Sequence, residues 1–370
     1  MRLGIDVRMI DWSGIGRYTE NLISGLKEFG EGVEPVLFCD PVNAHKIPEN
    51  LDFERYDLST KVFALASPIR LNRELASYSF DVFHTPHFVS PLGSTSYPVV
   101  ITIHDLTPLI ITKSMPSWVQ RRYYYMLNLL AAKKASMIIV PSESTKKDIT
   151  RIFGTAEHKI KVIHEGTHGI FGKVSEERIA HTKEKFGIRS DYIFALGNQK
   201  PNKGLEYLID AYNELINRKH LRHELIFTGL RSDKFKGVTD RIAKYGLEQK
   251  ARFIGRTTDD ELIDLYNGAS VFVFPSLYEG FGLPPLEAMA CETPVVASNR
   301  SSVPEVAGNA ALIIDPTSTG KLAEAILAVI DDNKLRDDLV EKGLRRIQDF
   351  SLEKFTQETI SVYEQVLIER

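Results

Sequence analysis

Short apolar segments alternate with amphipathic segments along almost the whole of this 370-residue chain. Unbroken apolar runs are typical of strands buried on both faces of a parallel sheet, and amphipathic segments between them are typical of covering helices. The alternation therefore predicts an α/β fold with parallel sheets. The predicted strands are residues 2–7, 33–38, 82–84, 99–103, 137–140, 159–163, 192–196, 224–228, 251–254, 271–275, 294–297 and 311–314, and the predicted helices include 18–29, 205–217 and 259–267.

The strands fall into two series that are separated by the polar stretch 166–190. A chain of this length is also too long for one compact core. We therefore predict two Rossmann-like domains that face each other across a cleft, with boundaries at residues 1–170 and 171–351. The last segment, 352–370, is predicted to form an amphipathic helix that returns to the N-terminal domain.

Polar residues follow several of the predicted strands directly. In an open parallel sheet, ligands bind at the carboxyl ends of the strands, so these residues are the first candidates for a site. They occur in both halves of the chain, as a site between two domains requires. They are Asp6, His84, His104, Asp105, the loop 197–204 and the loop that contains Glu279.

The loop that begins at Glu279 carries the strongest functional signal. It follows the apolar run 269–275 and precedes a predicted helix with Pro284 or Pro285 in its first turn, where a missing N–H costs nothing. This order of strand, glycine loop and helix N-terminus presents N–H groups and a positive dipole to an anion. Glu287, expected in the first helical turn, can accept from two ribose hydroxyls, while Glu279 faces whatever the phosphates carry. The spacing predicts a site for a nucleotide-diphosphate sugar; the alternative is a surface Glu279 with a dipole-stabilising Glu287.

Two lysines follow the predicted strand 192–196. Lys200 and Lys203 lie in the loop 197–204 just before a predicted helix, where their charge would neutralise a diphosphate. The loop is not a P-loop, because the G-K-[ST] ending is missing. The alternative is a solvated lysine loop.

A second glycine-containing loop follows the first predicted strand and is expected to enter a helix at Tyr18. Gly14 and Gly16 would let the backbone approach a ligand closely, and we favour contact with a donor or acceptor sugar. Dinucleotide binding is the alternative, since Asp40 ends the second strand. However, Thr19 replaces the third glycine of the G-x-G-x-x-G fingerprint.

Histidines give one candidate pair and one misleading motif. His104, with Asp105, follows a strand and is equally consistent with ligand contact and with a structural role; His84 is a weaker candidate of the same kind. His164 and His168 match the zinc motif H-E-x-x-H, but strand-like alternation precedes them and glycines at 166 and 169 oppose a helix.

The acidic run 259–261 also suggests a metal site at first sight. Thr258 or Asp259 is better explained as a helix N-cap with acids in the first turn, so we expect no metal there.

Composition excludes several classes of function. The net charge of −3 argues against nucleic acid as a partner. Cys39 and Cys291 lack metal-ligand spacing and are interpreted as reduced packing residues. We see no signal-peptide pattern and no apolar run near the roughly 18 residues of a spanning helix, which predicts a cytoplasmic location. The segment 117–134 mixes Trp118 with basic residues and fits either a packed helix or a peripheral contact with the inner face of a membrane.

Taken together, these motifs resemble those of the family-4 (group 1) retaining glycosyltransferases of the GT-B fold, and in particular its mannosyltransferase-like members. The resemblance extends over essentially the whole chain. Its motifs are GIGRY at 14–18, TIHDL at 102–106, VPSES at 140–144, PSLYEGFGLP at 275–284, EAMA at 287–290, PVVAS at 294–298 and PEVAG at 304–308.

The resemblance implies a set of site residues. Glu287 would hold the donor ribose, Glu279 would contact hydroxyls of the transferred sugar, and Lys203 would bind the diphosphate. His104 would lie on the acceptor side, near the reacting sugar. The implied catalytic residues are Glu279, His104 and Lys203; the donor-binding residues are Gly14, Gly16, Asn198, Lys200, Lys203, Glu279, Gly280, Phe281, Gly282, Leu283 and Glu287; and the acceptor-side residues are His84, His104 and Asp105.

Two positions depart from the family pattern. Many members carry Arg where this chain has Asn198, and we interpret Lys200 as a replacement for the missing charge. Glu292 stands where glycine is usual.

The expected function is metal-independent, retaining transfer of a hexose, with mannose from GDP-mannose as the first choice. The acceptor would be a saccharide or lipid-linked saccharide in surface-polysaccharide synthesis, and no cofactor is expected. Three alternatives stay open: a UDP-sugar-dependent glucosyl- or galactosyltransferase, a zinc hydrolase built on His164 and His168, and a non-catalytic sugar-nucleotide binder.

Overall fold

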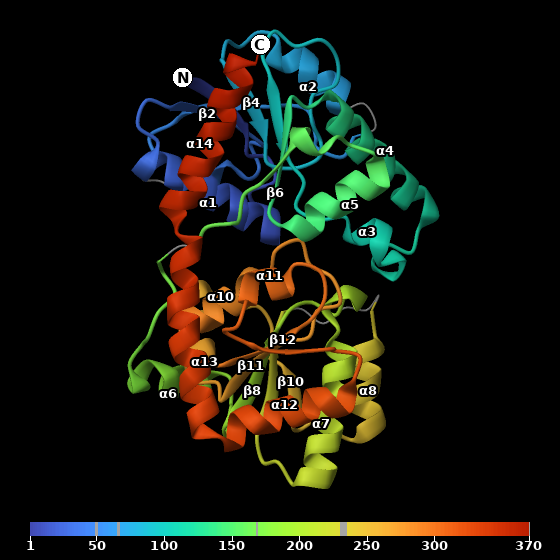
Figure 1. Ribbon diagram of the computed structural model, residues 1–370, viewed down its shortest axis with the longest axis vertical. Helices are drawn as coiled ribbons and strands as arrows, with labels where there is room; N and C mark the ends of the chain where they lie inside the picture. Colours follow the sequence, from blue (N-terminus) through green and yellow to red (C-terminus); the bar gives the residue numbers. More distant parts are fainter. Residues whose placement is uncertain (49–50, 65–66, 168, 230–234, 370) are drawn as a thin grey trace. The chain divides into compact units, whose positions relative to one another are not determined.

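The computed structural model describes residues 1–48, 51–64, 67–167, 169–229 and 235–369. The chain divides into two compact units. The first comprises Met1–Ile110, Met115–Gly166 and Phe350–Arg370, and the second comprises Ile111–Ser114 and Thr167–Asp349. Each unit contains a parallel sheet with helices packed on both faces, as the alternation in the sequence predicts (Figure 1).

The sheet of the first unit has the strand order β3-β2-β1-β4-β5-β6-β7, and all its neighbours pair in parallel. Its strands are β1 (Arg2–Asp6), β2 (Glu34–Cys39), β3 (Glu54–Asp57), β4 (Val82–Thr85), β5 (Val99–Thr102), β6 (Met137–Val140) and β7 (Ile160–Val162). Its helices are α1 (Ser13–Phe29), α2 (Ser67–Leu75), α3 (Thr107–Ile110), α4 (Trp118–Lys134), α5 (Glu143–Phe153) and α14 (Leu352–Ile368).

The C-terminal helix α14 packs beside α1 on one face of this first sheet, as predicted for the last segment. Tyr18 of α1 and Phe355 of α14 meet edge to face, with ring centroids 5.2 Å apart. Helices α2, α4 and α5 contribute the buried side chains of the other face, so the sheet is buried on both sides. This double burial is why the strands read as unbroken apolar runs.

The second unit has the order β10-β9-β8-β11-β12-β13, which repeats the order of the first sheet without a counterpart of β7. Its strands are β8 (Tyr192–Leu196), β9 (Glu224–Thr228), β10 (Ala251–Phe253), β11 (Val271–Phe274), β12 (Val295–Ser298) and β13 (Leu312–Ile314). Its helices are α6 (Glu176–Lys185), α7 (Leu205–Lys219), α8 (Gly237–Tyr245), α9 (Asp259–Asn267), α10 (Leu283–Ala290), α11 (Val303–Ala307), α12 (Thr319–Asp331) and α13 (Asn333–Arg346).

In both sheets the strand order reverses at one place, between β1 and β4 in the first unit and between β8 and β11 in the second. We call each of these places a switch point. The connections on its two sides leave toward opposite faces of the sheet, and in open parallel sheets ligands bind at the carboxyl ends of the strands at such a point. The fold therefore directs attention to the loops after β1, β4, β8 and β11.

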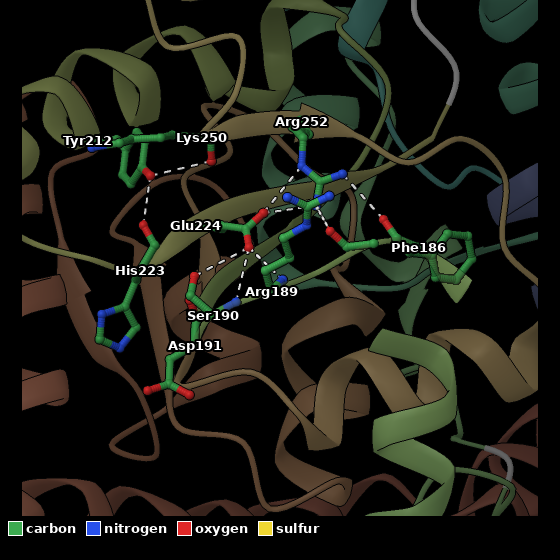
Figure 2. A network of polar contacts seen from close by, with 10 residues as sticks. Phe186, Arg189, Ser190, Asp191, Tyr212, His223, Glu224, Lys250 and Arg252 are labelled. Atoms are coloured by element: carbon green, nitrogen blue, oxygen red, sulfur yellow. Dashed lines mark hydrogen bonds and ion pairs between the residues drawn. The ribbon is translucent and has the colours of Figure 1, made fainter. Parts of the chain in front are cut away.

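The amino ends of β8, β9 and β10 are tied together by the carboxylate of Glu224 (Figure 2). It accepts from the backbone N–H groups of Arg189 and Ser190 at 2.8 and 3.1 Å, and it pairs with Arg252 at 2.8 Å. Arg252 in turn donates to the carbonyl of Phe186 at 3.2 Å (Figure 2). This network holds the amino ends of these strands together. The switch-point loops follow the carboxyl ends, on the opposite side of the sheet.

Several local predictions can be compared with the structure. Thr258 caps α9 in a capping box with Glu261, which confirms the N-cap interpretation. Cys39 and Cys291 are free and buried, as predicted for packing residues. The edge strand β3 was missed, because its charged, exposed residues give no apolar run.

Candidate functional site

At the second switch point, Lys203 and Glu279 come together from loops that are far apart in the sequence. Lys203 lies in the loop after β8 and Glu279 in the loop after β11, and these two strands are neighbours. The Lys203 Nζ lies 2.8 Å from Oε1 of Glu279. Both side chains are partly exposed, at 20% and 15%, so the pair is accessible to a ligand. The lysine also lies over the ring of Phe274, with Nζ 5.9 Å from its centroid.

Two serines hold the Glu279 loop in place. The backbone N–H of Glu279 donates to Oγ of Ser301 at 2.8 Å. The hydroxyl of Ser302 lies within hydrogen-bonding distance of the carbonyl oxygens of Glu279 and Phe281, at 3.0 and 2.7 Å. The sequence prediction missed both serines. They follow β12, the neighbour of β11, so the rule that selects polar residues after strands could have found them.

Glu287 lies on α10 and is almost buried, at 9% exposure. Its Oε2 accepts from the hydroxyl of Tyr266, 3.0 Å away at the end of α9. The prediction that Glu287 belongs to the first helical turn is wrong, because α10 begins at Leu283 and Glu287 is in its second turn. Tyr266 was not predicted as a site residue, since it reads as part of an apolar helix face.

The N-terminus of α10 has fewer free N–H groups than an ordinary helix. Pro284 falls in the first turn as predicted, and Pro285 follows it, so two of the first three helical residues lack a donor. Gly282 caps the helix with a φ of 106°, a left-handed conformation that favours glycine. An anion at this end would therefore depend on the helix dipole and on the N–H groups of Gly282 and Leu283.

The remaining residues of the β8 loop form a tight turn. The Oδ1 of Asn198 accepts from the backbone N–H of Lys200 at 3.2 Å, as in an Asx turn. Asn198 and Lys200 are both exposed. Gly197 has a φ of 138°, a backbone conformation that favours glycine. The replacement of the family's arginine by Lys200 stays a prediction.

The first switch point is also polar, but its charges are buried. Arg8 donates to both carboxylate oxygens of Asp6, at 2.8 and 2.6 Å, and His87 Nε2 lies 3.2 Å from the same carboxylate. All three side chains are inaccessible to solvent. Burial alone would raise the pKa of Asp6, but Arg8 and His87 outweigh it and hold that pKa well below its usual range.

His84 is fully buried in the core of the first unit. Its Nδ1 lies 2.6 Å from the hydroxyl of Tyr363 on α14, and its Nε2 lies 2.9 Å from the hydroxyl of Thr102. Burial lowers the pKa of His84 to about 3, so the ring stays neutral. With both nitrogens engaged inside the protein, His84 holds α14 to the sheet in this structure and offers no nitrogen to an acceptor sugar.

His104 is better placed, because its side chain remains 14% exposed at the end of β5. Its Nε2 lies 3.0 Å from the carbonyl oxygen of Pro86, and its Nδ1 lies 3.6 Å from Oε1 of Glu165. The neighbouring Asp105 accepts from the backbone N–H of Thr107 at 2.7 Å and so begins α3. Asp105 therefore has a structural role at the start of α3, and its contact with an acceptor stays a prediction.

The expectation of a glycine loop before Tyr18 is wrong. Helix α1 begins at Ser13, so Gly14 and Gly16 lie in its first turns. A Cβ on Gly16 would collide with the backbone carbonyl of Ile10, which explains glycine at this position by packing. Gly14 is exposed and has open space where a Cβ would be.

The H-E-x-x-H motif does not form a helical zinc site. His164 and Glu165 lie in an irregular segment after β7, and His168 is outside the described residues. The ring of His164 packs on Phe350, with centroids 5.5 Å apart. Within the described ranges, no group of three or more His, Cys, Asp or Glu side chains is arranged to hold a metal ion.

Across the same residues, no helix has both the length and the apolar content needed to cross a bilayer.

Comparison with known proteins shows the family of this chain. Residues 12–168 match the family model described as Glycosyltransferase Family 4, and residues 177–346 match the one described as Glycosyl transferases group 1. The chain belongs to the family-4 (group 1) glycosyltransferases. This glycosyltransferase is 29% identical to the O-antigen chain mannosyltransferase B of Escherichia coli, over 95% of its own chain and 96% of that relative. It is 28% identical to the O-antigen chain mannosyltransferase RfbU of Salmonella typhimurium, over 85% and 86% of the two chains.

Solved structures show the fold of this glycosyltransferase independently. Sucrose-phosphate synthase from Thermosynechococcus elongatus superimposes with a TM-score of 0.80 over 100% of both chains, at 20% identity. HepE from Anabaena, solved in complex with UDP and glucose, gives a TM-score of 0.78 over 99% and 100% of the two chains, at 19% identity. The fold is therefore that of the GT-B glycosyltransferases.

Proposed function

We propose that this glycosyltransferase transfers mannose from GDP-mannose to a saccharide or lipid-linked saccharide acceptor in the synthesis of a surface polysaccharide. The names of its relatives support the sugar and the pathway class, since both O-antigen enzymes are mannosyltransferases. The observation that carries the donor site is the contact between Lys203 and Glu279 at the second switch point. The choice of guanine as the base follows from the similarity of the loop 197–203 to that of mannosyltransferase-like members.

Lys203 has two successive partners in the proposed cycle. Without donor, its ammonium group is paired with Glu279 at 2.8 Å. A diphosphate carries more negative charge than one carboxylate and would draw the ammonium group to itself. Glu279 is then released to accept hydrogen bonds from hydroxyls of the transferred sugar. One contact thus prepares both the phosphate-binding group and the sugar-binding group.

Departure of the nucleoside diphosphate requires that its growing negative charge be stabilised. Lys203, the exposed Lys200 and the N-terminal end of α10 supply fixed positive charge for this step, and we propose that no divalent ion takes part. Glu287, oriented by Tyr266, would hold the ribose. Family resemblance implies that the new bond forms on the face from which the phosphate leaves, with retention at the anomeric carbon.

Ligand stabilisation followed by a transfer assay tests the proposal. GDP at about 100 times its Kd should stabilise the protein by about 2.7 kcal/mol, and UDP and ADP should stabilise it less. GDP-mannose with a saccharide acceptor should then give an α-linked product by NMR. Stabilisation by UDP instead of GDP would favour the UDP-sugar alternative, and stabilisation without product on any acceptor would favour a non-catalytic binder.

Helix α4 supports a peripheral contact with the inner face of a membrane. Trp118 and Val119 are 71% and 58% exposed at its N-terminus, and Arg122, Lys133 and Lys134 are exposed along it. Exposed apolar side chains beside basic ones favour an anionic lipid surface. We expect co-sedimentation with phosphatidylglycerol vesicles and not with phosphatidylcholine vesicles. Trp118→Ala should weaken the binding, and equal binding by the variant would exclude this helix as the contact.

A further inference from the structure

Trp12 and Phe63 form a pair of exposed aromatic side chains in the first unit. Their ring centroids lie 5.2 Å apart, and the ring planes are tilted by 41°. Trp12 is 49% exposed and Phe63 is 44% exposed. Single exposed apolar side chains are common on protein surfaces, whereas large apolar side chains that share one exposed patch are typical of interaction sites. The pair therefore calls for a ligand or a partner.

Local structure does not explain a tryptophan at position 12. Trp12 is the N-cap residue of α1, with an extended backbone, and its side chain makes no capping hydrogen bond. Ser, Thr, Asp and Asn are preferred at an N-cap because their side-chain oxygen accepts from N–H groups of the first turn, which an indole N–H cannot do. The ring is also half-exposed, so it contributes only part of its area to packing. Neither the start of the helix nor the core accounts for this residue.

The exposed pair is one end of a row of four aromatic rings. Phe63 lies 6.3 Å from Phe88, and Phe88 lies 4.9 Å from Tyr124, measured between ring centroids. Trp12, Phe63 and Phe88 belong to the segments that follow β1, β3 and β4, so they lie at the edge where these parallel strands end. At the other end of the row, the hydroxyl of Tyr124 donates to the carbonyl of Asp105 at 2.9 Å. The row therefore runs from the surface to the segment that carries the predicted acceptor-side residues.

Hydrogen bonds hold the backbone of the segment that carries Phe63. Arg8, in the loop after β1, donates to the carbonyl of Thr60 at 2.6 Å. The carboxylate of Glu74 on α2 accepts from the backbone N–H groups of Ser59 and Thr60 at 2.8 and 3.2 Å. The segment after β3 is thus tied both to the first switch point and to α2. A ligand that stacks on the rings meets a backbone already in place, which lowers the entropy cost of binding.

Polar side chains from two neighbouring loops lie beside Trp12. Nδ2 of Asn43 donates to Oδ1 of Asp11 at 3.3 Å, and Nζ of Lys46 lies 3.6 Å from Oδ2 of Asp11. The side chains of Asp11 and Lys46 remain 31% and 42% exposed. The charged groups of the first switch point itself are buried, so this edge suits a neutral ligand better than a phosphate. Apolar rings flanked by accessible hydrogen-bonding groups fit a sugar, which has C–H groups on the face of its ring and hydroxyls around it.

We propose that the row of rings from Trp12 to Tyr124 binds the saccharide part of the acceptor, with Trp12 and Phe63 stacked against a sugar beyond the one that reacts. The identity of the ligand as a saccharide rests on the proposed function, but the exposed aromatic pair does not. Stacking adds contact area away from the reacting hydroxyl and takes no part in the chemistry. Trp12 and Phe63 therefore make the enzyme prefer acceptors of two or more sugars over a single sugar.

Tryptophan fluorescence tests saccharide binding without a donor and without transfer. The chain has two tryptophans, so Trp118→Phe leaves Trp12 as the reporter and Trp12→Phe leaves Trp118. Each full-length variant is titrated with α-linked disaccharides and trisaccharides of mannose, glucose and galactose, up to about 10 mM. We expect a saturable change in the emission of Trp12 and a constant emission of Trp118, which is 71% exposed on α4. Unchanged emission of Trp12 with every saccharide, or a response of Trp118 alone, would overturn the proposal.

Acceptor kinetics test the role in transfer with a variant that should not impair folding. Trp12→Ser removes the ring and supplies the hydroxyl that an N-cap of α1 prefers. It should raise the KM for a trisaccharide acceptor by about tenfold and leave kcat and the KM for GDP-mannose within about twofold. Trp12→Phe keeps an aromatic ring and should recover most of the loss. Ile368→Ser, at an apolar position of the same unit that is 84% exposed, is the matched control.

The two experiments separate this inference from the proposed function. An unchanged acceptor KM in Trp12→Ser would exclude the row of rings as the acceptor site, even with GDP-mannose established as the donor. A saturable response of Trp12 to saccharides without transfer from GDP-mannose would support the saccharide site and contradict the proposed donor.

Discussion

The two switch points have the same position in the same strand order but opposite access to solvent. In the second unit, Lys203 and Glu279 meet at 2.8 Å and remain 20% and 15% exposed. In the first unit, Asp6, Arg8 and His87 form an ion cluster whose side chains are fully buried. Strand order explains why polar residues gather at both places, since parallel strands end at the same edge.

Access decides what the gathered residues can do. The buried cluster has already satisfied its charges internally: Asp6 takes two hydrogen bonds from Arg8, which also donates to the carbonyl of Thr60 at 2.6 Å. In the described part of the chain, Lys203 and Glu279 form an ion pair with each other and remain partly accessible to solvent, so a stronger anion can replace one partner. We interpret the first cluster as a scaffold that fixes β1 against β4, and the second as the ligand-binding pair.

The largest effect is expected from breaking the buried cluster. Asp6→Asn keeps the size of the side chain but leaves Arg8 buried without a counter-charge, which should cost about 3–5 kcal/mol. Both tryptophans of the chain, Trp12 and Trp118, belong to the first unit, so urea unfolding followed by their fluorescence reports on that unit. Asp52→Asn, at an exposed position of the same unit, is the control. If Asp6→Asn instead kept its stability and lost nucleotide binding, the first switch point would be a ligand site.

Breaking the exposed pair should give the reverse pattern. Lys203→Ala should lower kcat/KM by about 100-fold or more, because it removes the positive charge that stabilises the departing phosphate. Its stability should change by no more than about 1 kcal/mol, since Glu279 remains 15% exposed and keeps access to water when its partner is removed. Lys321→Ala, at an exposed position on α12, is the control. Loss of stability without loss of transfer would make the pair structural.

The pH dependence of the first unit sharpens the comparison through His84. Its pKa is about 3 in the fold, because burial favours the neutral ring, and 6.5 is the ordinary value. Between these values the unfolded chain binds a proton that the folded chain does not, so stability falls as the pH falls, by about 1.4 kcal/mol per pH unit for this group. Urea unfolding followed by tryptophan fluorescence at several pH values measures the slope. His84→Asn should flatten it by this amount, and equal slopes would show that His84 is not buried as described.

The smallest effect is expected at Glu292, away from both switch points. Its φ of 57° is left-handed, which explains why glycine is usual at this position. Its carboxylate pairs with Lys173 at the surface. Glu292→Gly relieves the backbone strain and loses the surface pair, so thermal unfolding should show a gain of up to about 1 kcal/mol with unchanged transfer. Lys173→Ala isolates the contribution of the pair, and a loss above about 1 kcal/mol in Glu292→Gly would show that the pair outweighs the strain.

The sequence predicts the elements of this fold better than it predicts their access to solvent. Buried strands such as β8 and β11 are readable because burial on both faces demands unbroken apolar runs. Lys203 and Glu279 each follow a strand, so the rule that ligands bind at the carboxyl ends of parallel strands selects both residues. His84 satisfies the same rule yet is buried, because its partner Tyr363 arrives from α14, 279 residues later in the chain.

Other misses have a similar physical origin. Tyr266 reads as a core residue, and only the packing of α9 against α10 brings its hydroxyl to Glu287. Glu165 reads as the base of a zinc motif, and only the neighbouring segments bring its carboxylate to within 3.6 Å of His104. Each of these contacts joins residues that no local pattern relates to each other.

Hydrogen–deuterium exchange with and without GDP tests most directly that the second switch point, and not the first, receives the nucleotide diphosphate. Saturating GDP should slow exchange in residues 197–204 and 276–283, leave residues 6–12 unchanged, and have no effect on any of these segments in Lys203→Ala. Protection of residues 6–12 in place of the second-unit loops, or protection that survives in Lys203→Ala, would contradict this account.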